Sequence, residues 1–168
     1  MRATLSTPVS VKFLRLLAAL SIIVSLGFVS ANATTNSVTV EQLNPSAALN
    51  PQEVVRIQLQ ALRANDSADH GIEICFRFAS PTNQASTGPV ARFGQMIKDG
   101  IYSLMLNYEE AQYQNVEIVD RYARQKVTLV GTSKIVTFVF YLSKQTHSQC
   151  EECWMTDSVA IEEILEST

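Results

Sequence analysis

Residues 135–142 read Ile-Val-Thr-Phe-Val-Phe-Tyr-Leu and form the clearest strand pattern in the chain. Side chains of a strand alternate between its two faces, so the even-numbered residues of this run share one face and the odd-numbered residues share the other. Both sets are largely apolar. This pattern is typical of a central strand covered on both faces, and it predicts a buried sheet in the C-terminal half of the chain.

More strands are expected on both sides of this run. Apolar alternation and the turn residues between segments predict them at residues 101–108, 111–120, 123–130 and 154–161. Gly131-Thr132-Ser133 suits a hairpin loop that leads into the strand at 135–142. The sequence therefore predicts an antiparallel sheet of about five strands.

A helix is expected well before the first strand. Asn50 is a favoured N-cap residue, Pro51 suits the first helical turn, and Glu53 favours the positive end of the helix dipole. Apolar residues then recur at helical spacing as far as the turn at Asn65-Asp66. These signals predict one long amphipathic helix.

The connection between this helix and the strands is less regular. Residues 71–78 fit a strand and a short helix equally well, so both interpretations stay open. A loop is expected at 81–88 and a helix at 89–98. Helices followed by strands indicate the α+β class, with N-terminal helices packed on a strongly curved antiparallel sheet.

The first 33 residues have the pattern of a secretory signal peptide. Basic residues at positions 2, 12 and 15 precede an apolar core at 16–29, and Ala31-Asn32-Ala33 suits signal peptidase. We expect a protein of the secretory pathway or the extracellular space. The alternatives are a plastid lumen reached through the secretory route and an uncleaved anchor, although residues 16–31 fall short of the roughly 20 that span a bilayer.

The remaining chain is long enough for one domain. Removal of residues 1–33 leaves 135 of the 168 residues, with a flexible linker expected at 34–49 and one domain at 50–168. The net charge of −3 becomes −6, because the leader carries three basic residues and no acidic one. An acidic domain with scattered cations is a poor partner for nucleic acid, so we expect none, and no membrane contact once the signal is removed.

Several short strings carry a resemblance to a known family. They are Gln-Leu-Gln-Ala-Leu-Arg-Ala-Asn-Asp at 58–66, Asp-His-Gly-Ile-Glu at 69–73, Phe-Arg-Phe-Ala-Ser-Pro at 76–81 and Trp-Met-Thr-Asp-Ser-Val at 154–159, with Gly88-Pro89, Arg92-Phe93 and the segment at Tyr102. Together they resemble the nuclear transport factor 2-like, or cystatin-like, superfamily, and within it the domain of unknown function 4864 family. The resemblance implies a cone-shaped sheet closed on one side by helices, often dimeric, whose mouth holds a small apolar ligand or an active site.

The cysteines are the first candidates for chemistry. In an exported chain Cys150 and Cys153 favour a disulfide, and a thiol–disulfide sensor is the alternative. His147 could join them as a zinc ligand, but no second Cys or His pair completes a tetrahedron, so we expect no metal and no cofactor. Cys75, between two apolar residues, is expected to be a small buried side chain.

Three other residues could form an acid–base set. His70 follows Asp69 and could act as a general acid or base, while Tyr102 and Asp157 are among the polar residues that the resemblance would allow inside the cone, beside Tyr122 and Tyr141. A cofactor-free isomerase or dehydratase is therefore one hypothesis. Because no convincing catalytic set is present, we expect instead a non-enzymatic module that binds a small apolar ligand or a protein partner, including a second copy. Asn65-Asp66-Ser67 is a candidate glycosylation site.

Overall fold

The run at 135–142 lies in the middle strand of one antiparallel sheet. It belongs to β4 (Lys134–Lys144), which pairs with β3 (Tyr122–Val130) on one side and β5 (Trp154–Glu166) on the other. On its other edge β3 pairs with β1 (Glu110–Tyr113) and, further along, with β2 (Glu117–Val119). The order is β1-β3-β4-β5, so the sheet stays open between β1 and β5. The computed structural model describes residues 43–146 and 150–166.

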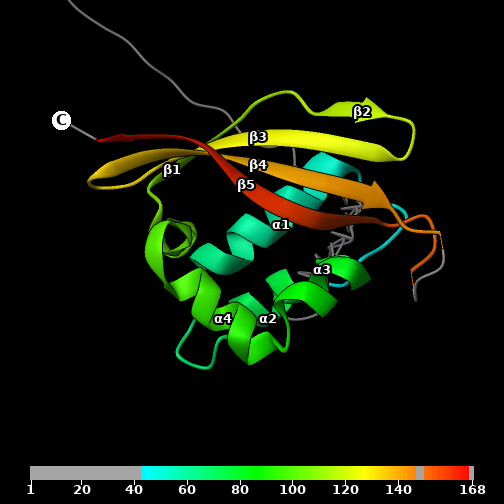
Figure 1. The fold of residues 1–168 in the computed structure, drawn as a ribbon, viewed down its shortest axis with the longest axis horizontal. Helices are drawn as coiled ribbons and strands as arrows, with labels where there is room; N and C mark the ends of the chain where they lie inside the picture. Colours follow the sequence, from blue (N-terminus) through cyan, green and yellow to red (C-terminus); the bar gives the residue numbers. More distant parts are fainter. Residues whose placement is uncertain (1–42, 147–149, 167–168) are drawn as a thin grey trace, which may run out of the picture. The chain divides into compact units, whose positions relative to one another are not determined.

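The helices of the described residues all precede the sheet in the chain and lie on one of its faces, as Figure 1 shows. They are α1 (Pro51–Arg63), α2 (His70–Arg77), α3 (Pro81–Thr87), α4 (Val90–Lys98), the 3₁₀ helix η2 (Gly100–Ser103) and α5 (Leu104–Asn107). This arrangement confirms the α+β class and the prediction of helices packed on an antiparallel sheet. Within the described residues, no helix combines the length and the apolar character needed to cross a membrane.

The first helix forms for the reasons that the sequence indicates. The Asn50 side chain accepts a hydrogen bond from the backbone N–H of Glu53, and the Glu53 carboxylate accepts one from the backbone N–H of Asn50. This capping box satisfies two amide groups that would otherwise have no partner at the helix start. Residues on the inner side of α1, including Val55 and Leu59, are completely buried.

Two predictions between the helix and the sheet are wrong. The predicted loop at 81–88 is α3, because Ser80 caps the helix by accepting from Asn83 N–H and Pro81 occupies its first turn. The predicted strand at 101–108 is η2 followed by α5, with Met105 and Tyr108 buried against the core. The open choice at 71–78 resolves as the helix α2.

The strand boundaries also differ from the predictions. The segment expected as one strand at 111–120 forms two short strands, β1 and β2, which pair with separate parts of β3. The last strand continues to Glu166, five residues beyond its predicted end. It carries two register shifts against β4, next to Thr137 and next to Tyr141. Such irregularities bend a strand and increase the local twist of the sheet.

The core lies between the helices and the even-numbered face of β4. Val136, Phe138 and Phe140 on this face are at most 2 % exposed. On the opposite face Val139 is also buried, although the helices lie on the other side. There Lys126 of β3 forms an ion pair of 2.6 Å with Glu162 of β5, reaching across β4 beside Val139. The extended side chains of Lys126 and Glu162 thus cover part of the face of β4 that points away from the helices, and the sequence predicts that both faces are covered.

The segment before α1 is held to the domain. Residues 43–49 are the described end of the expected linker, and Leu43 and Leu49 pack against the core. Arg77 donates a 2.9 Å hydrogen bond to the carbonyl oxygen of Leu43 and a second bond to the side chain of Asn44. The predicted signal peptide at 1–33 and linker residues 34–42 lie outside the described residues.

Candidate functional site

A cavity of about 120 Å³ lies between the helices and the inner face of the sheet. It is lined by Gln58, Leu62, Cys75, Ala79, Asn83, Thr87, Phe93, Met96, Ile97, Tyr102, Met105, Phe140, Thr156 and Val159. These residues come from α1, α2, α3, α4 and α5, from the connection between α2 and α3, from η2 and from strands β4 and β5. Met96 is 42 % exposed, so this lining side chain also reaches the protein surface.

The polar side chains around the cavity bind one another or the backbone. Gln58 donates to the carbonyl oxygen of Cys75 at 3.1 Å and accepts from the hydroxyl of Thr156 at 2.6 Å. Asn83 donates to the carbonyl oxygen of Thr156, and the hydroxyl of Thr87 donates to the carbonyl oxygen of Asn83. Tyr102 donates to the carbonyl oxygen of Val159 at 3.2 Å. Each polar lining residue therefore already has a hydrogen-bond partner within the protein.

These internal hydrogen bonds affect which chemical groups the cavity offers to a ligand. The polar side chains already have partners within the protein, and the exposed lining is formed mainly by apolar atoms. Burial raises the pKa of the Cys75 thiol to about 12, so this lining residue stays a neutral thiol. The cavity offers no anion and no activated nucleophile.

The structure does not bring the three predicted acid–base residues together. His70 lies at the exposed start of α2, where its Nδ1 atom is 2.6 Å from Oδ2 of Asp66. Tyr102 lines the cavity and stacks near Phe138 with 5.9 Å between ring centroids. Asp157 accepts a 3.0 Å hydrogen bond from the hydroxyl of Ser143, and it is not among the cavity residues. The three groups have separate partners and share no cavity.

The candidate glycosylation residue has a role in the α1–α2 connection. The side-chain amide of Asn65 donates to Oδ1 of Asp69, and its carbonyl oxygen accepts from the backbone N–H of Ile72, both at 3.1 Å. Asp69 itself forms a 2.7 Å ion pair with Lys98. The nitrogen that would carry an oligosaccharide is therefore engaged in holding the two helices together.

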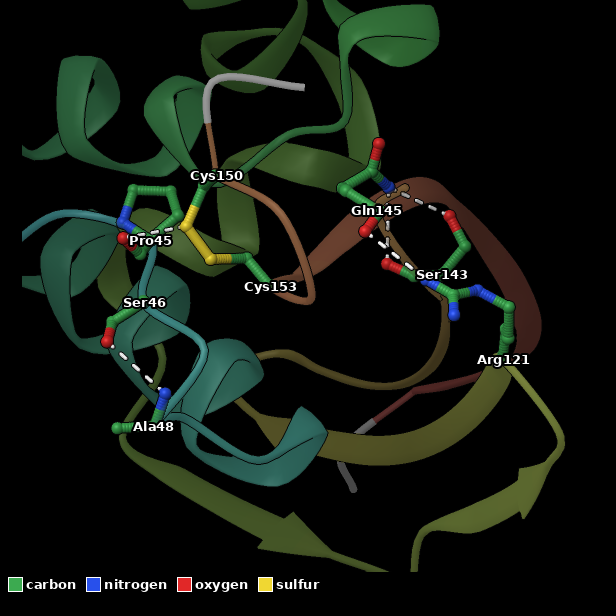
Figure 2. Close-up of a disulfide and its surroundings, with 8 residues drawn as sticks. All are labelled: Pro45, Ser46, Ala48, Arg121, Ser143, Gln145, Cys150 and Cys153. Carbon is green, nitrogen blue, oxygen red and sulfur yellow. Dashed lines mark hydrogen bonds between the residues drawn. A yellow bond between two sulfur atoms is a disulfide. The ribbon is translucent and has the colours of Figure 1, made fainter. Parts of the chain in front are cut away.

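Cys150 and Cys153 form a disulfide in the loop between β4 and β5 (Figure 2). Cys153 is fully buried, and Sγ of Cys150 lies 3.3 Å from the carbonyl oxygen of Pro45. Glu152, between them, forms ion pairs with Arg121 at 2.8 Å and Lys144 at 3.2 Å. The bridge thus fixes a tight loop next to the segment that leads into α1.

The zinc alternative finds no support in the described part of the chain. His147 lies outside the described residues, and no group of three or more His, Cys, Asp or Glu residues within them could hold a metal ion.

Most of the cavity residues could not be selected from the sequence. Tyr102 is the residue that both sequence and structure place there. The rest are ordinary core residues contributed by segments far apart in the chain, so no local spacing marks them. The one available signal is the unusual presence of Gln58 on the buried side of an otherwise apolar helix face.

Comparison with known proteins identifies a family and nothing further. No curated protein and no solved structure gave a significant match. The sequence profile of the family described as "Domain of unknown function (DUF4864)" matches residues 45–167, which is most of the chain and all of the described fold from Pro45 onwards. The chain therefore belongs to the DUF4864 family.

Proposed function

We propose that this domain is a non-enzymatic module that binds a small apolar molecule in the cavity between the helices and the sheet. The observation that carries the proposal is the set of satisfied polar groups around an apolar interior. A guest with hydrogen-bonding groups would lose its bonds to water and find few new partners, which is unfavourable. An apolar guest would lose none.

The size of the cavity limits the guest. Its 120 Å³ lies below the range of about 300–1,000 Å³ that is typical of drug-sized ligands. It approaches the volume of about 150 Å³ that accommodates benzene in an engineered cavity. We therefore assign a ring or short alkyl group of about six carbons. At about 0.8 kcal/mol per buried carbon, such a guest would bind with a Kd on the order of 0.1–1 mM.

We infer further that the domain belongs to the nuclear transport factor 2-like superfamily and works outside the cytosol. The helix-covered antiparallel sheet with an interior cavity supports the first inference. The Cys150–Cys153 disulfide supports the second, because disulfides persist in oxidising compartments.

A ligand titration tests the proposal. Benzene, toluene and naphthalene are added to the ¹⁵N-labelled protein, and chemical shifts of the cavity residues are followed by NMR. Benzene and toluene are expected to shift signals of Val159 and Met105, whereas naphthalene, which is larger, is expected to bind more weakly. Val159→Phe, which points a larger side chain into the cavity, should abolish the shifts.

The control is the neighbouring position on the same strand. Ala160 is exposed on the opposite face of β5, so Ala160→Phe adds the same ring without filling the cavity. Equal loss of binding in both variants would contradict the cavity as the site. Failure of all three ligands to shift any cavity signal would contradict the function itself.

A second candidate function is self-association through β5. The strand lies at the edge of the sheet, and Ile161, Ile164 and Leu165 in its C-terminal half are exposed large hydrophobic residues. Exposed apolar edge strands favour pairing with another chain. Sedimentation velocity is expected to show a dimer that Ile164→Lys dissociates. A monomer at high concentration would rule this out.

A further inference from the structure

A second hollow lies outside the apolar cavity, on the other side of α1. This groove, of about 320 Å³, is lined by Arg56, Gln60, Arg63 and Ala64 at α1 and by Tyr108, Ala111 and Tyr113 at or just before β1. It therefore runs between the solvent-facing side of a helix and the edge strand of the sheet. None of its residues is shared with the cavity of the proposed function.

Two arginines are held in place along the groove. The guanidinium of Arg56 lies 4.1 Å from the ring centroid of Tyr113, and that of Arg63 lies 4.9 Å from the ring centroid of Tyr108. Both distances are within the range of cation–π attraction. Tyr108 is itself fixed, because its hydroxyl donates to the carbonyl oxygen of Leu59. The rings thus orient both cations before any ligand arrives.

The charge of the groove is not balanced locally. Burial raises the pKa of Tyr108 and of Tyr113, so both rings stay neutral at physiological pH and do not offset the cations. Among the ion pairs of residues 43–146 and 150–166, no carboxylate pairs with Arg56 or Arg63. This is notable in a chain with 16 acidic and 13 basic residues. The groove is a cationic site in an acidic protein, which favours an anionic ligand.

The spacing of the two cations favours an elongated ligand. Arg56 and Arg63 are seven residues apart on α1, which corresponds to about 10 Å along the helix axis. Alternate side chains of an extended peptide are roughly 7 Å apart and share one face. Because arginine side chains are long, acidic residues two or four positions apart on a strand fall within reach of both guanidiniums.

The edge of the sheet supplies a second kind of recognition. The backbone N–H of Gln114 donates to the carbonyl oxygen of Lys126 in β3. Backbone groups alternate in direction along an antiparallel strand. The backbone groups of Ala111 and Tyr113, two of the groove residues, are therefore directed away from β3, towards the open edge of the sheet. In the described sheet β1 has one neighbouring strand, β3. An incoming extended peptide could pair with this edge.

We propose that the groove between α1 and β1 binds an acidic, extended segment of a partner protein, which adds to the edge of β1 and places alternate carboxylates on Arg56 and Arg63. The arginine fork matches a carboxylate in two parallel hydrogen bonds, which gives geometric selectivity besides charge. Strand pairing gives register, and the two arginines give the preference for acidic side chains.

The test uses labelled peptides and the full-length protein. A fluorescent peptide in which Glu alternates with Val is titrated by fluorescence anisotropy, beside a matched peptide in which Gln replaces Glu. The acidic peptide is expected to bind at least tenfold more tightly than the neutral one, with an affinity that falls as salt is added. Equal affinity of the two peptides would overturn the proposal without the need for any variant.

Variants of the arginines localise the effect. Arg56→Gln and Arg63→Gln are each expected to lower the affinity for the acidic peptide by about fivefold, and the double variant is expected to lower it by more than tenfold. Both side chains are exposed, so the fold should persist, as circular dichroism will check. Arg92→Gln, an exposed arginine on α4, is the matched control and should leave affinity unchanged. Equal effects of Arg92→Gln and the double variant would overturn the site.

Two further arms distinguish a peptide from a free anion and test pairing with β1. Sebacate is a dicarboxylate long enough to span the two arginines, and it should compete only weakly with the labelled acidic peptide. Competition as strong as that of the unlabelled peptide would overturn the assignment to a peptide. N-methylation of either the Glu amides or the Val amides removes donors from one edge of the peptide. Strand pairing predicts that one of these two peptides loses binding and the other keeps it. Equal behaviour of both would overturn pairing with β1.

Discussion

The packing of α2 against α1 depends on a single missing methyl group at Gly71. A Cβ atom added there would overlap the carbonyl oxygen of Ala61 and lie 2.9 Å from Cα of Asn65. Both neighbours are backbone atoms of α1 or the turn that follows it, so no side-chain rotation relieves the overlap. The two helices would have to separate to make room for Gly71→Ala.

The size of the effect follows from comparison with Gly94. A Cβ at Gly94, in the middle of α4, would meet the Ile72 side chain at 3.5 Å, which is ordinary van der Waals contact. Gly94→Ala is therefore expected to stabilise the protein by about 0.5–1 kcal/mol, through helix propensity and a less flexible unfolded chain. Gly71→Ala is expected to destabilise it by about 1–3 kcal/mol, the usual range for overpacking.

Urea denaturation followed by circular dichroism measures both variants. With an m value of about 2 kcal/mol per M, the two midpoints should differ by about 1–2 M and lie on opposite sides of the wild-type midpoint. A Gly71→Ala protein as stable as the wild type would refute the reasoning, because it would mean that the helices separate at no cost. A destabilised Gly94→Ala protein would refute the comparison.

Three other predictions concern cysteines and charge. The Cys150–Cys153 bridge closes a four-residue loop, for which chain entropy predicts a stabilisation of at most about 2 kcal/mol. Dithiothreitol should therefore lower the urea midpoint only modestly, and a larger loss of stability would show a wider structural role. Cys75 is buried and its pKa is raised to about 12, so iodoacetamide should label it, by mass spectrometry, only after denaturation. A hydrogen bond from Arg121 lowers the pKa of Glu152 below its usual 4.5. The stability that this ion pair contributes is present above pH 4.5 and is lost as the pH falls through the lowered pKa of Glu152 in the folded protein. Thermal melts at a series of pH values should therefore be less pH-dependent below pH 4.5 in Glu152→Gln, and an unchanged profile would contradict the ion pair.

The success of the sequence predictions depended on whether a segment had one strong local signal. The helix at 51–63 had a capping box and a proline in its first turn, and β4 had apolar residues on both faces. The segment at 101–108 fitted both a helix and a strand. Ile101, Leu104, Met105 and Tyr108 recur at helical spacing, but β-branched and aromatic residues there also fit a strand. Tertiary packing of Met105 and Tyr108 against the core decided between them.

A different error occurred at Ser80-Pro81. Proline disfavours a helical conformation in the residue before it, which led to the prediction that the segment at 71–78, strand or helix, ends there and that a loop follows. The same pair also begins helices well, since serine is a favoured N-cap residue and proline suits the first turn. The structure uses the pair to end α2 and start α3 within a few residues. The distinction needs knowledge of what the next turn packs against, which spacing alone does not provide.

The two proposed sites share the helix α1 as a wall. Gln58 and Leu62 of this helix line the apolar cavity, whereas Arg56 and Arg63 line the cationic groove. Fixing a helix for both purposes requires contacts that do not depend on either ligand. Completely buried residues such as Leu59 and the close approach permitted by Gly71 provide them. Each site uses a different face of α1, and the segment from Met105 to Tyr108 is a second connection between them, so a guest in the cavity can alter the groove through either segment. The packing at Gly71 opposes a movement of α1.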